Sequence, residues 1–486
     1  MNALAGLKGR RVLVLGLGAF GGGSGCARAL ARLGAEVTVT DLRPPEQLRE
    51  ALQELDGLPV RYALGGHSEE LFAAAELVVV NPAVPNDSPW LAVARRCGCT
   101  LTTDLNLALA AARDVPAFAV TGTHGKSTCV ALARHLLGGS GARVTLAGNL
   151  GGSILDSVAG LGRSGRLVLE LSSFQTERLE LPVPAASSTP AASGGWPAVA
   201  AVTSLSADHL DRHGSVEAYH AAKRRLLAFQ GAEDLAVLPL DLPDRRSWAE
   251  AARGQVLWLS PGPLPSGQEG YCVASGQVVE RLNGRERTLF ALSAAPFQEP
   301  YRLPSLLAAV AGARGLGLPA EEVAARLRSF QGLPHRMEQL PAPRGLAYID
   351  NGVATHPEPT VAALEHLGTS VVLVAGGKDK HLPLDELAAA SRGCRRLHLF
   401  GSGGERLARL CRQQGLEPTL HAGCSAAVAA ALADAQPGDA VLFSPSFSSY
   451  DEFRNFRDRA LVFRESCRRM LADAQSSVGD TSTATY

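Results

Sequence analysis

The segment AVTGTHGKST (119–128) combines glycines, a lysine and hydroxyl side chains, which is a set that binds phosphate groups. Gly122 and Gly125 free the backbone, so that N–H groups can turn towards phosphate oxygens at the start of a helix. Lys126 would then reach the outer phosphates, and the Ser127 hydroxyl would face a magnesium ion. A plain strand-to-helix turn explains two glycines but not Gly-Lys-Ser-Thr. The segment therefore predicts a nucleotide site.

Two further stretches carry groups that would hold a cation beside this phosphate site. The apolar run RLVLE ends at Glu170, where a buried carboxylate is costly unless a cation or another partner neutralises it. The loop DHLDRH (208–213) brings two aspartates and two histidines together. His209 and Glu170, with Ser127, would complete a site for a hard cation. The alternatives are a structural ion pair for Glu170 and solvated charge in the loop.

Lysine is scarce in this chain. Of the 47 Lys and Arg residues only five are lysines, namely Lys8, Lys126, Lys223, Lys378 and Lys380. A lysine survives in such a chain by chance or where a compact ammonium or a reactive amine is required. Lys223 follows Ser215, a predicted helix N-cap, and shares the apolar face of that helix with Tyr219. We therefore expect Lys223 to point inward as a functional amine, with a snorkelling lysine as the alternative.

Alternating strands and helices must position these groups. Apolar runs at 11–16, 36–41 and 76–84 predict strands of a parallel sheet, whose ligands bind at the carboxyl ends of the strands. The glycine loop at 16–21, with Asp41 closing the second strand, has the form of a dinucleotide-binding turn, although other nucleotides use the same turn. Strand, polar loop and helix recur from Val115 and again after the segment GLPHRMEQ.

We therefore predict an α/β protein with three nucleotide-fold modules. The expected ranges are 1–112, 113–332 and 333–473, with a flexible insertion at 182–198 and a disordered tail at 474–486. The net charge is zero, so the composition does not indicate a polybasic nucleic-acid or membrane surface. The nine cysteines form no Cys-x-x-Cys pair, and no apolar run is long enough for a signal peptide or a membrane helix. We expect a monomer in the cytoplasm.

Several motifs together resemble the Mur ligase family of peptidoglycan synthesis. They are VTGTHGKST, GNLG, ELSSFQ, DHLDRHGS, GLPHRMEQ and SPSFSSYDEFRNF, and they extend from residue 10 to about 472. The ATP loop of that family also lacks the early glycine, which here is Val120. ELSSFQ and SPSFSSYDEF favour the glutamate-adding members. The resemblance implies a Rossmann-like N-terminal domain, a P-loop ATPase-like central domain and a Rossmann-like C-terminal domain.

The resemblance also implies the reaction and its site residues. ATP and Mg²⁺ would drive amide formation between UDP-N-acetylmuramoyl-L-alanine and glutamate through an acyl phosphate. The implied ATP site comprises Gly122, Thr123, His124, Gly125, Lys126, Ser127, Thr128 and Arg336, with Lys126, Glu170, His209 and Lys223 as catalytic residues. The implied magnesium ligands are Ser127, Glu170, His209 and a carbamylated Lys223. Gly18, Asp41, Arg43 and Asn149 would bind the UDP-sugar, and Thr355, Lys378, Lys380, Ser449 and Phe456 the glutamate.

The chain departs from the family pattern in DNGVATH (350–356). Val353 replaces the usual lysine and Asn351 the usual aspartate. We expect Lys378 to replace part of the missing charge, with D-glutamate preferred and L-glutamate as the rival acceptor. Three other functions compete: a folylpolyglutamate synthase-like ligase, a nicotinamide dehydrogenase and a non-catalytic subunit. Binding of a uridine nucleotide in the first module would separate the muramyl ligase from the folate ligase.

Overall fold

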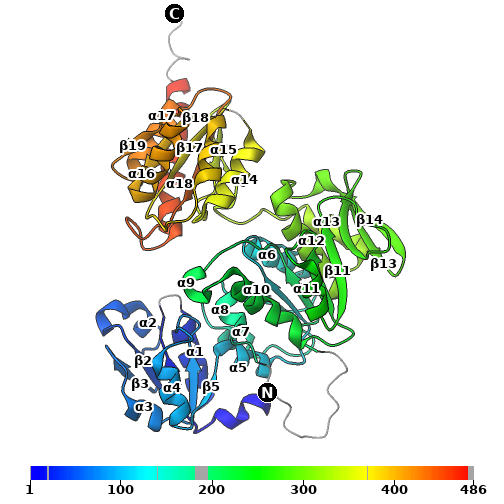
Figure 1. The fold of residues 1–486 in the computed structure, drawn as a ribbon, viewed down its shortest axis with the longest axis vertical. Coiled ribbons are helices and arrows are strands. Elements are labelled where there is room, and N and C mark those ends of the chain that lie inside the picture. The colour runs from blue at the N-terminus through cyan, green and yellow to red at the C-terminus, as the bar shows by residue number, and fades with distance from the viewer. Residues whose placement is uncertain (1, 19–20, 140, 181–194, 369, 480–486) are drawn as a thin grey trace, which may run out of the picture. The chain divides into compact units, whose positions relative to one another are not determined.

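The computed structural model describes residues 2–18, 21–139, 141–180, 195–368 and 370–479, and the chain divides into two compact units, Met1–Phe330 and Gln331–Tyr486. Within these described ranges the first unit contains two β-sheets and the second contains one (Figure 1). The predicted α/β class with three modules is confirmed. Most of the predicted insertion at 182–198 lies outside the described residues, and the boundaries at 112/113 and 332/333 stay predictions.

The first sheet is parallel and has the strand order β3-β2-β1-β4-β5. Its strands are β1 (Arg11–Leu15), β2 (Glu36–Asp41), β3 (Val60–Leu64), β4 (Leu77–Val80) and β5 (Thr100–Thr102). The helices are η1 (Asn2–Leu7), α1 (Gly22–Arg32), η2 (Pro45–Gln47), α2 (Arg49–Gln53), α3 (Glu69–Ala73), α4 (Pro89–Arg96) and α5 (Asp104–Ala111). The predicted strands are present as β1, β2 and β4. The central ones are continuous Val and Leu runs because both faces of a parallel sheet are buried.

The second sheet has the order β14-β13-β12-β11-β10-β9-β6-β8-β7. Its strands are β6 (Ala117–Thr121), β7 (Val144–Gly148), β8 (Arg166–Glu170), β9 (Val199–Val202), β10 (Leu235–Pro239), β11 (Gln255–Ser260), β12 (Gly270–Ala274), β13 (Gln277–Leu282) and β14 (Arg285–Ala291). The helices are α6 (Lys126–Leu137), α7 (Ile154–Val158), α8 (Ser173–Thr176), α9 (Leu210–His213), α10 (Val216–Arg224), η3 (Arg225–Phe229), α11 (Arg245–Ala251), η4 (Leu292–Ala294), η5 (Pro300–Arg302), α12 (Leu303–Gly315) and α13 (Ala320–Leu327). The sheet is parallel except where β13 pairs with β12 and β14.

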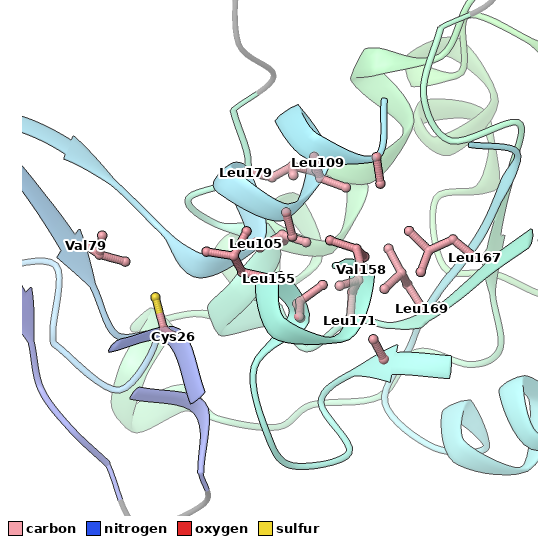
Figure 2. Close-up of a cluster of buried hydrophobic side chains, with 14 of the residues drawn as sticks. Cys26, Val79, Leu105, Leu109, Leu155, Val158, Leu167, Leu169, Leu171 and Leu179 are labelled. Carbon is pink, nitrogen blue, oxygen red and sulfur yellow. The ribbon is translucent and has the colours of Figure 1, made fainter. Parts of the chain in front are cut away.

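One hydrophobic core joins the two sheets of the first unit. Figure 2 shows side chains of α5 and α7 packed beside those of β8, with Cys26 of α1 and Val79 of β4 in the same cluster. The other labelled members of this cluster are Leu105, Leu109, Leu155, Val158, Leu167, Leu169, Leu171 and Leu179. Because burial of apolar area is the main stabilising term in folding, this shared core holds the two sheets together.

The sheet of the second unit has the order β15-β16-β20-β17-β18-β19. Its strands are β15 (Glu338–Leu340), β16 (Ala347–Asp350), β17 (Val371–Gly376), β18 (Cys394–Phe400), β19 (Thr419–His421) and β20 (Ala440–Ser446). The helices are α14 (Pro357–Leu367), α15 (Asp385–Ala390), η6 (Ser391–Gly393), α16 (Gly401–Gln413), α17 (Cys424–Asp434) and α18 (Phe456–Gly479). Helix α18 extends through residues 474–479, where the predicted disordered tail begins, and the rest of that tail, 480–486, lies outside the described residues. Among the described residues, no helix is long and apolar enough to cross a bilayer.

Candidate active site

The predicted phosphate loop connects β6 to α6, as the sequence indicated. Gly122 has φ +145°, and a Cβ added there would lie 2.2 Å from Thr203 Oγ1. Gly125 has φ +81° and is the N-cap of α6, which begins at Lys126. Only glycine accommodates both the left-handed conformation and the close approach of a neighbouring chain. The two glycines therefore shape a backbone cradle at a helix N-terminus, where anions bind favourably, with Ser127 and Thr128 in the first helical turn.

Two lysines meet at one carbonyl oxygen of this loop. Lys126 Nζ donates to the carbonyl oxygens of Gly122 at 2.9 Å and of Thr123 at 2.8 Å. Lys223 Nζ, from α10, donates to the same Gly122 oxygen at 2.7 Å. Its side chain is buried, with only 2% of the residue exposed, so the inward orientation predicted from the helical pattern is confirmed. Ser215 caps α10 as predicted, because its Oγ accepts a hydrogen bond from the backbone N–H of Ala218.

The surroundings of Lys223 disfavour its charged form. Burial and the nearby Lys126 charge hold the pKa of the Lys223 amine well below its ordinary value, although the carboxylates of Asp208 and Glu170 oppose that shift. The Nζ atom also lies 4.5 Å from the ring centroid of Tyr219. A lysine with a lowered pKa is more often the neutral, nucleophilic amine.

Glu170 is the last residue of β8 and is 2% exposed. Its Oε1 accepts a hydrogen bond from the side-chain amide of Asn149 at 3.1 Å. Its Oε2 is buried and has no hydrogen-bond partner among the described residues. An unpartnered buried carboxylate oxygen is costly, and a bound cation removes that cost. The geometry fits the predicted role of Glu170 as a ligand for a hard cation.

The loop that carries His209 lies against the aromatic side chains of Phe174 and Tyr219. The His209 ring centroid is 4.9 Å from that of Phe174 and 6.2 Å from that of Tyr219. The Tyr219 hydroxyl in turn lies 3.2 Å from Thr123 Oγ1 in the phosphate loop. Tyr219 therefore links the lysine helix, the histidine loop and the phosphate loop. His209 adopts a left-handed backbone conformation, with φ +51°, at the start of α9.

Sequence reasoning missed several polar residues that shape the phosphate loop. The backbone N–H of His124 donates to Ser204 Oγ at 3.0 Å, and that of Ser206 donates to Thr123 Oγ1 at 3.0 Å. These serines belong to TSLS, which follows the apolar strand β9. The signal was present, because polar residues after a buried parallel strand lie at the ligand-binding edge of the sheet. Ser305 Oγ also donates to the Gly125 carbonyl at 3.2 Å, from the start of α12.

The residues predicted to bind the UDP-sugar fall into two groups. Asp41 accepts hydrogen bonds from the backbone N–H groups of Leu17 at 2.9 Å and Gly18 at 3.4 Å, and it pairs with Arg43 at 3.0 Å. Burial alone would raise the pKa of Asp41, but hydrogen bonds from Arg43 and from Leu17 outweigh burial and lower it. Asn149 instead contacts Glu170. The structure thus places Asp41, Arg43 and Gly18 together and Asn149 beside Glu170.

A cavity opens near this glycine loop, within the first unit. It lies between elements of the first and second sheets, and residues that line it include Gly16, Asn81, Pro82, Asp104, Gly152 and Gln175. Asp104 caps α7 from this wall, because its carboxylate accepts hydrogen bonds from Ser153 Oγ at 2.7 Å and from the backbone N–H of Ile154 at 2.7 Å. The cavity adjoins the loop that the sequence assigned to a nucleotide.

In the second unit, the predicted glutamate-binding residues follow neighbouring strands. Thr355 follows β16, Lys378 and Lys380 follow β17, and Ser449 follows β20. Since β20 lies between β16 and β17 and is parallel to both, the three loops start at one edge of the sheet. Lys378 and Ser448 pair through their backbones, with N···O distances of 2.9 and 3.2 Å. Phe456, also among the predicted residues, begins α18 and is half-buried.

The residues around GLPHRMEQ form an internal hydrogen-bonded cluster in the second unit. His335 Nδ1 lies 2.7 Å from Asp350 Oδ2, and the His335 backbone N–H donates to Glu338 Oε2 at 2.9 Å. The two carboxylates are thus each bonded to His335, as in a structural cluster. Asn351, at the position of the usual aspartate, donates to Ser444 Oγ at 3.0 Å inside the sheet. Arg336, the predicted ATP-ribose contact, is half-buried beside this cluster.

A phosphate cradle with two lysines and a buried carboxylate, in a three-sheet α/β chain, is typical of an enzyme that uses a nucleoside triphosphate. Three family models match: the Mur ligase MurD-like N-terminal domain at residues 10–103, the Mur ligase middle domain at 120–261 and the Mur ligase glutamate ligase domain at 335–447. The chain belongs to the Mur ligase family, whose members form amide bonds at the expense of ATP.

Curated relatives and solved structures agree with this assignment. The chain is 35% identical over 472 residues to UDP-N-acetylmuramoylalanine--D-glutamate ligase of Roseiflexus sp. (strain RS-1), covering 94% of this chain and 98% of the relative. The Geobacter metallireducens enzyme of the same name is 36% identical over 461 residues, covering 94% and 97%. The fold is similar to that of MurF from Acinetobacter baumannii, with a TM-score of 0.58, 15% identity and 93% of each chain covered. MurC from Thermotoga maritima gives a TM-score of 0.56 at 19% identity, covering 96% and 99%.

Proposed function

We propose that this protein is the ligase that adds D-glutamate to UDP-N-acetylmuramoyl-L-alanine in peptidoglycan precursor synthesis. ATP transfers its γ-phosphoryl group to the alanyl carboxylate, which gives an acyl phosphate and ADP. The glutamate amine then attacks the acyl carbon, phosphate leaves and the amine loses a proton. Relatives with this activity match the chain over almost its whole length, and neither a folylpolyglutamate synthase-like ligase nor a nicotinamide dehydrogenase is favoured.

The observation that carries the chemistry is the meeting of Lys126 and Lys223 at the Gly122 carbonyl, inside a cradle of backbone N–H groups. Carboxylate and phosphate anions repel each other, so their reaction needs a preorganised set of cations and N–H donors. Lys126 would turn from the loop carbonyls to the phosphates of ATP. The backbone from Gly122 to Thr128, with Thr123 and His124, would hold those phosphates in place.

Ser127, Glu170 and His209 would hold Mg²⁺ beside the phosphates. The fit rests on Glu170 Oε2, which is buried without a hydrogen-bond partner in the described part of the chain. Hydroxyl and carboxylate oxygens are ligands of the hard type that this ion prefers. When bound, the ion supplies charge neutralisation to the phosphate and carboxylate oxygens. Asn149 fixes the Glu170 carboxylate through Oε1, and Oε2 would be the oxygen that holds the cation.

Lys223 would act as a carbamate. Two ammonium groups on one carbonyl repel each other, and burial together with the Lys126 charge lowers the pKa of Lys223. Addition of CO₂ to the neutral Lys223 amine, with loss of a proton, forms an N–C bond and converts the cation to an anion. The repulsion with Lys126 then becomes attraction, and the carbamate oxygens can serve a second magnesium ion. Arginine could not replace Lys223, because its guanidinium remains protonated.

The two remaining substrates would bind at opposite ends of the chain. Gly18, Asp41 and Arg43 would contact the UDP moiety in the module 1–112, and Asn149 the sugar side. Thr355, Lys378, Lys380, Ser449 and Phe456 would bind glutamate in the module 333–473, with Arg336 at the ATP ribose. The backbone pairing of Lys378 with Ser448 supports the glutamate assignment, because it sets a lysine beside Ser449.

Mass spectrometry of the product tests the function directly. The protein is incubated with UDP-N-acetylmuramoyl-L-alanine, ATP and Mg²⁺, and with D-glutamate, L-glutamate or other amino acids. We expect ATP-dependent addition of one glutamate residue from the D isomer and release of ADP and phosphate. Exclusive use of L-glutamate, or no product with either isomer, would contradict the proposal. Cell fractionation and light scattering test the further proposal of a cytoplasmic monomer.

A further inference from the structure

Two arginines of the central elements hold the loop that follows β4. Arg178 donates from its two terminal nitrogens to the carbonyl oxygens of Asn81 at 3.4 Å and Val84 at 2.7 Å. Arg212 donates to the carbonyl of Pro82 at 3.3 Å. Three carbonyls within four residues are thus fixed by charged donors, and hydrogen bonds to charged groups are the stronger kind. Asn81 and Pro82 also line the cavity beside the glycine loop.

Glu177 connects these contacts. Its side chain pairs with Arg212, and each of the two side chains is only 8% exposed. Glu177 Oε2 also accepts a hydrogen bond from the Asn86 amide at 3.0 Å and lies 3.7 Å from His213 Nδ1. Removing one partner of a buried ion pair strongly destabilises a protein, because the other charge is left buried without a partner. We therefore expect Glu177 and Arg212 to keep fixed positions and to hold the groups bonded to them in place.

The same residues reach the loop of the cation site. Arg212 lies in the segment 208–213, three residues after His209, and its guanidinium carbon is 5.0 Å from the Phe174 ring centroid. The His209 ring packs on that same Phe174 ring, with centroids 4.9 Å apart. Arg178 and Arg212 therefore fix the cavity wall at residues 81–84, and Arg212 also fixes the proposed metal-binding loop at 208–213.

We propose that Glu177, Arg178 and Arg212 are positioning residues that set the wall of the UDP-substrate cavity relative to the catalytic cation loop. The inference rests on the proposed function, which assigns the substrates to these two places. The Arg178 side chain donates hydrogen bonds to the wall, so its loss loosens UDP-substrate binding. Glu177 contacts both sides through Arg212, so its loss affects UDP-substrate binding and Mg²⁺-ATP use together.

Steady-state kinetics separates this role from plain stabilisation. We expect Arg178→Ala to raise KM for the UDP-substrate about tenfold, the scale of a lost charge-assisted hydrogen bond, with KM for ATP unchanged. We expect Glu177→Gln to raise both KM values. Arg178→Lys keeps the charge but cannot span two carbonyls, so it should recover only part of the affinity, and it replaces the alanine variant if that variant does not fold.

The matched control is Glu280→Gln. Glu280 pairs with Arg314 at 2.7 Å and is also buried, but it lies on β13, at the other end of the sheet from β8. This control should lower Tm and leave all KM values unchanged. If Arg178→Ala and Glu177→Gln behave like the control, the cluster is merely structural and the inference is refuted. Failure of the wild type to make the D-glutamate product would instead refute the proposed function.

Discussion

Removing the charge of Glu170 should abolish the response of the protein to Mg²⁺ and nucleotide. In wild-type protein, Mg²⁺ and a non-hydrolysable ATP analogue at about 100 times Kd stabilise the folded state by about 2.7 kcal/mol. For the first unit, Met1–Phe330, such a gain raises Tm by about 4 °C, because the entropy of unfolding is about 2.1 cal/mol/K per residue. Glu170→Gln keeps the side-chain shape and the Asn149 contact to Oε1, but it replaces the oxygen that lacks a partner. The shift should vanish.

Differential scanning fluorimetry measures this shift with and without metal and nucleotide. Glu280→Gln is the control, because it alters a buried carboxylate that already has Arg314 as a partner. The control should start from a lower Tm but keep the wild-type shift of about 4 °C. A Glu170→Gln variant that still shows the full shift with Mg²⁺ and nucleotide would refute the argument that Glu170 holds the cation.

The other predictions concern lysines. Lys126→Arg should reduce ADP release about 10²-fold or more without unfolding the protein, because a planar guanidinium does not replace a point charge in a backbone cradle; near-normal turnover would contradict the assignment. Activity should fall in CO₂-depleted buffer and return with bicarbonate, and Lys223→Ala should be inactive; a fully active Lys223→Ala would make this lysine structural. Lys378→Ala should raise KM for D-glutamate about tenfold while KM for ATP stays constant, since the lost contact is charge-assisted; an unchanged glutamate KM would exclude compensation for Val353.

Local patterns predicted the parts of the fold in which residues near in sequence act together. The strand-loop-helix order around Lys126, the N-cap at Ser215 and the inward face of Lys223 depend on spacing within one or two turns of chain. The β13–β14 hairpin was missed, although Asn283 and Gly284 both have positive φ, which is the usual requirement of a tight hairpin turn. That signal was available in the sequence as an Asn-Gly pair.

Other contacts could not be read from the sequence, because they join distant segments. The bonds from Arg178 to the loop at 81–84 link residues more than ninety positions apart, and arginine is too common in this chain to be diagnostic. The pairing of Asp41 with Arg43 is local but was also missed, because the resemblance assigned both side chains to the UDP-sugar. The shared carbonyl of Lys126 and Lys223 depends on the placement of α10 against the phosphate loop.

The positions of the lysines explain in physical terms why some of them remain in this arginine-rich chain. Lys8 is exposed, and its stem lies near Gly34, so it could be arginine without cost. Lys126 and Lys223 could not be arginine, because both approach the Gly122 carbonyl within 2.9 Å and two guanidinium planes would not fit there. A guanidinium also could not lose its proton. Lys378 is exposed at the sheet edge beside Ser448, where a short point charge can meet a small carboxylate. Retention of lysine against an arginine-rich background is therefore informative where the ammonium is crowded or reactive, and uninformative where it is only solvated.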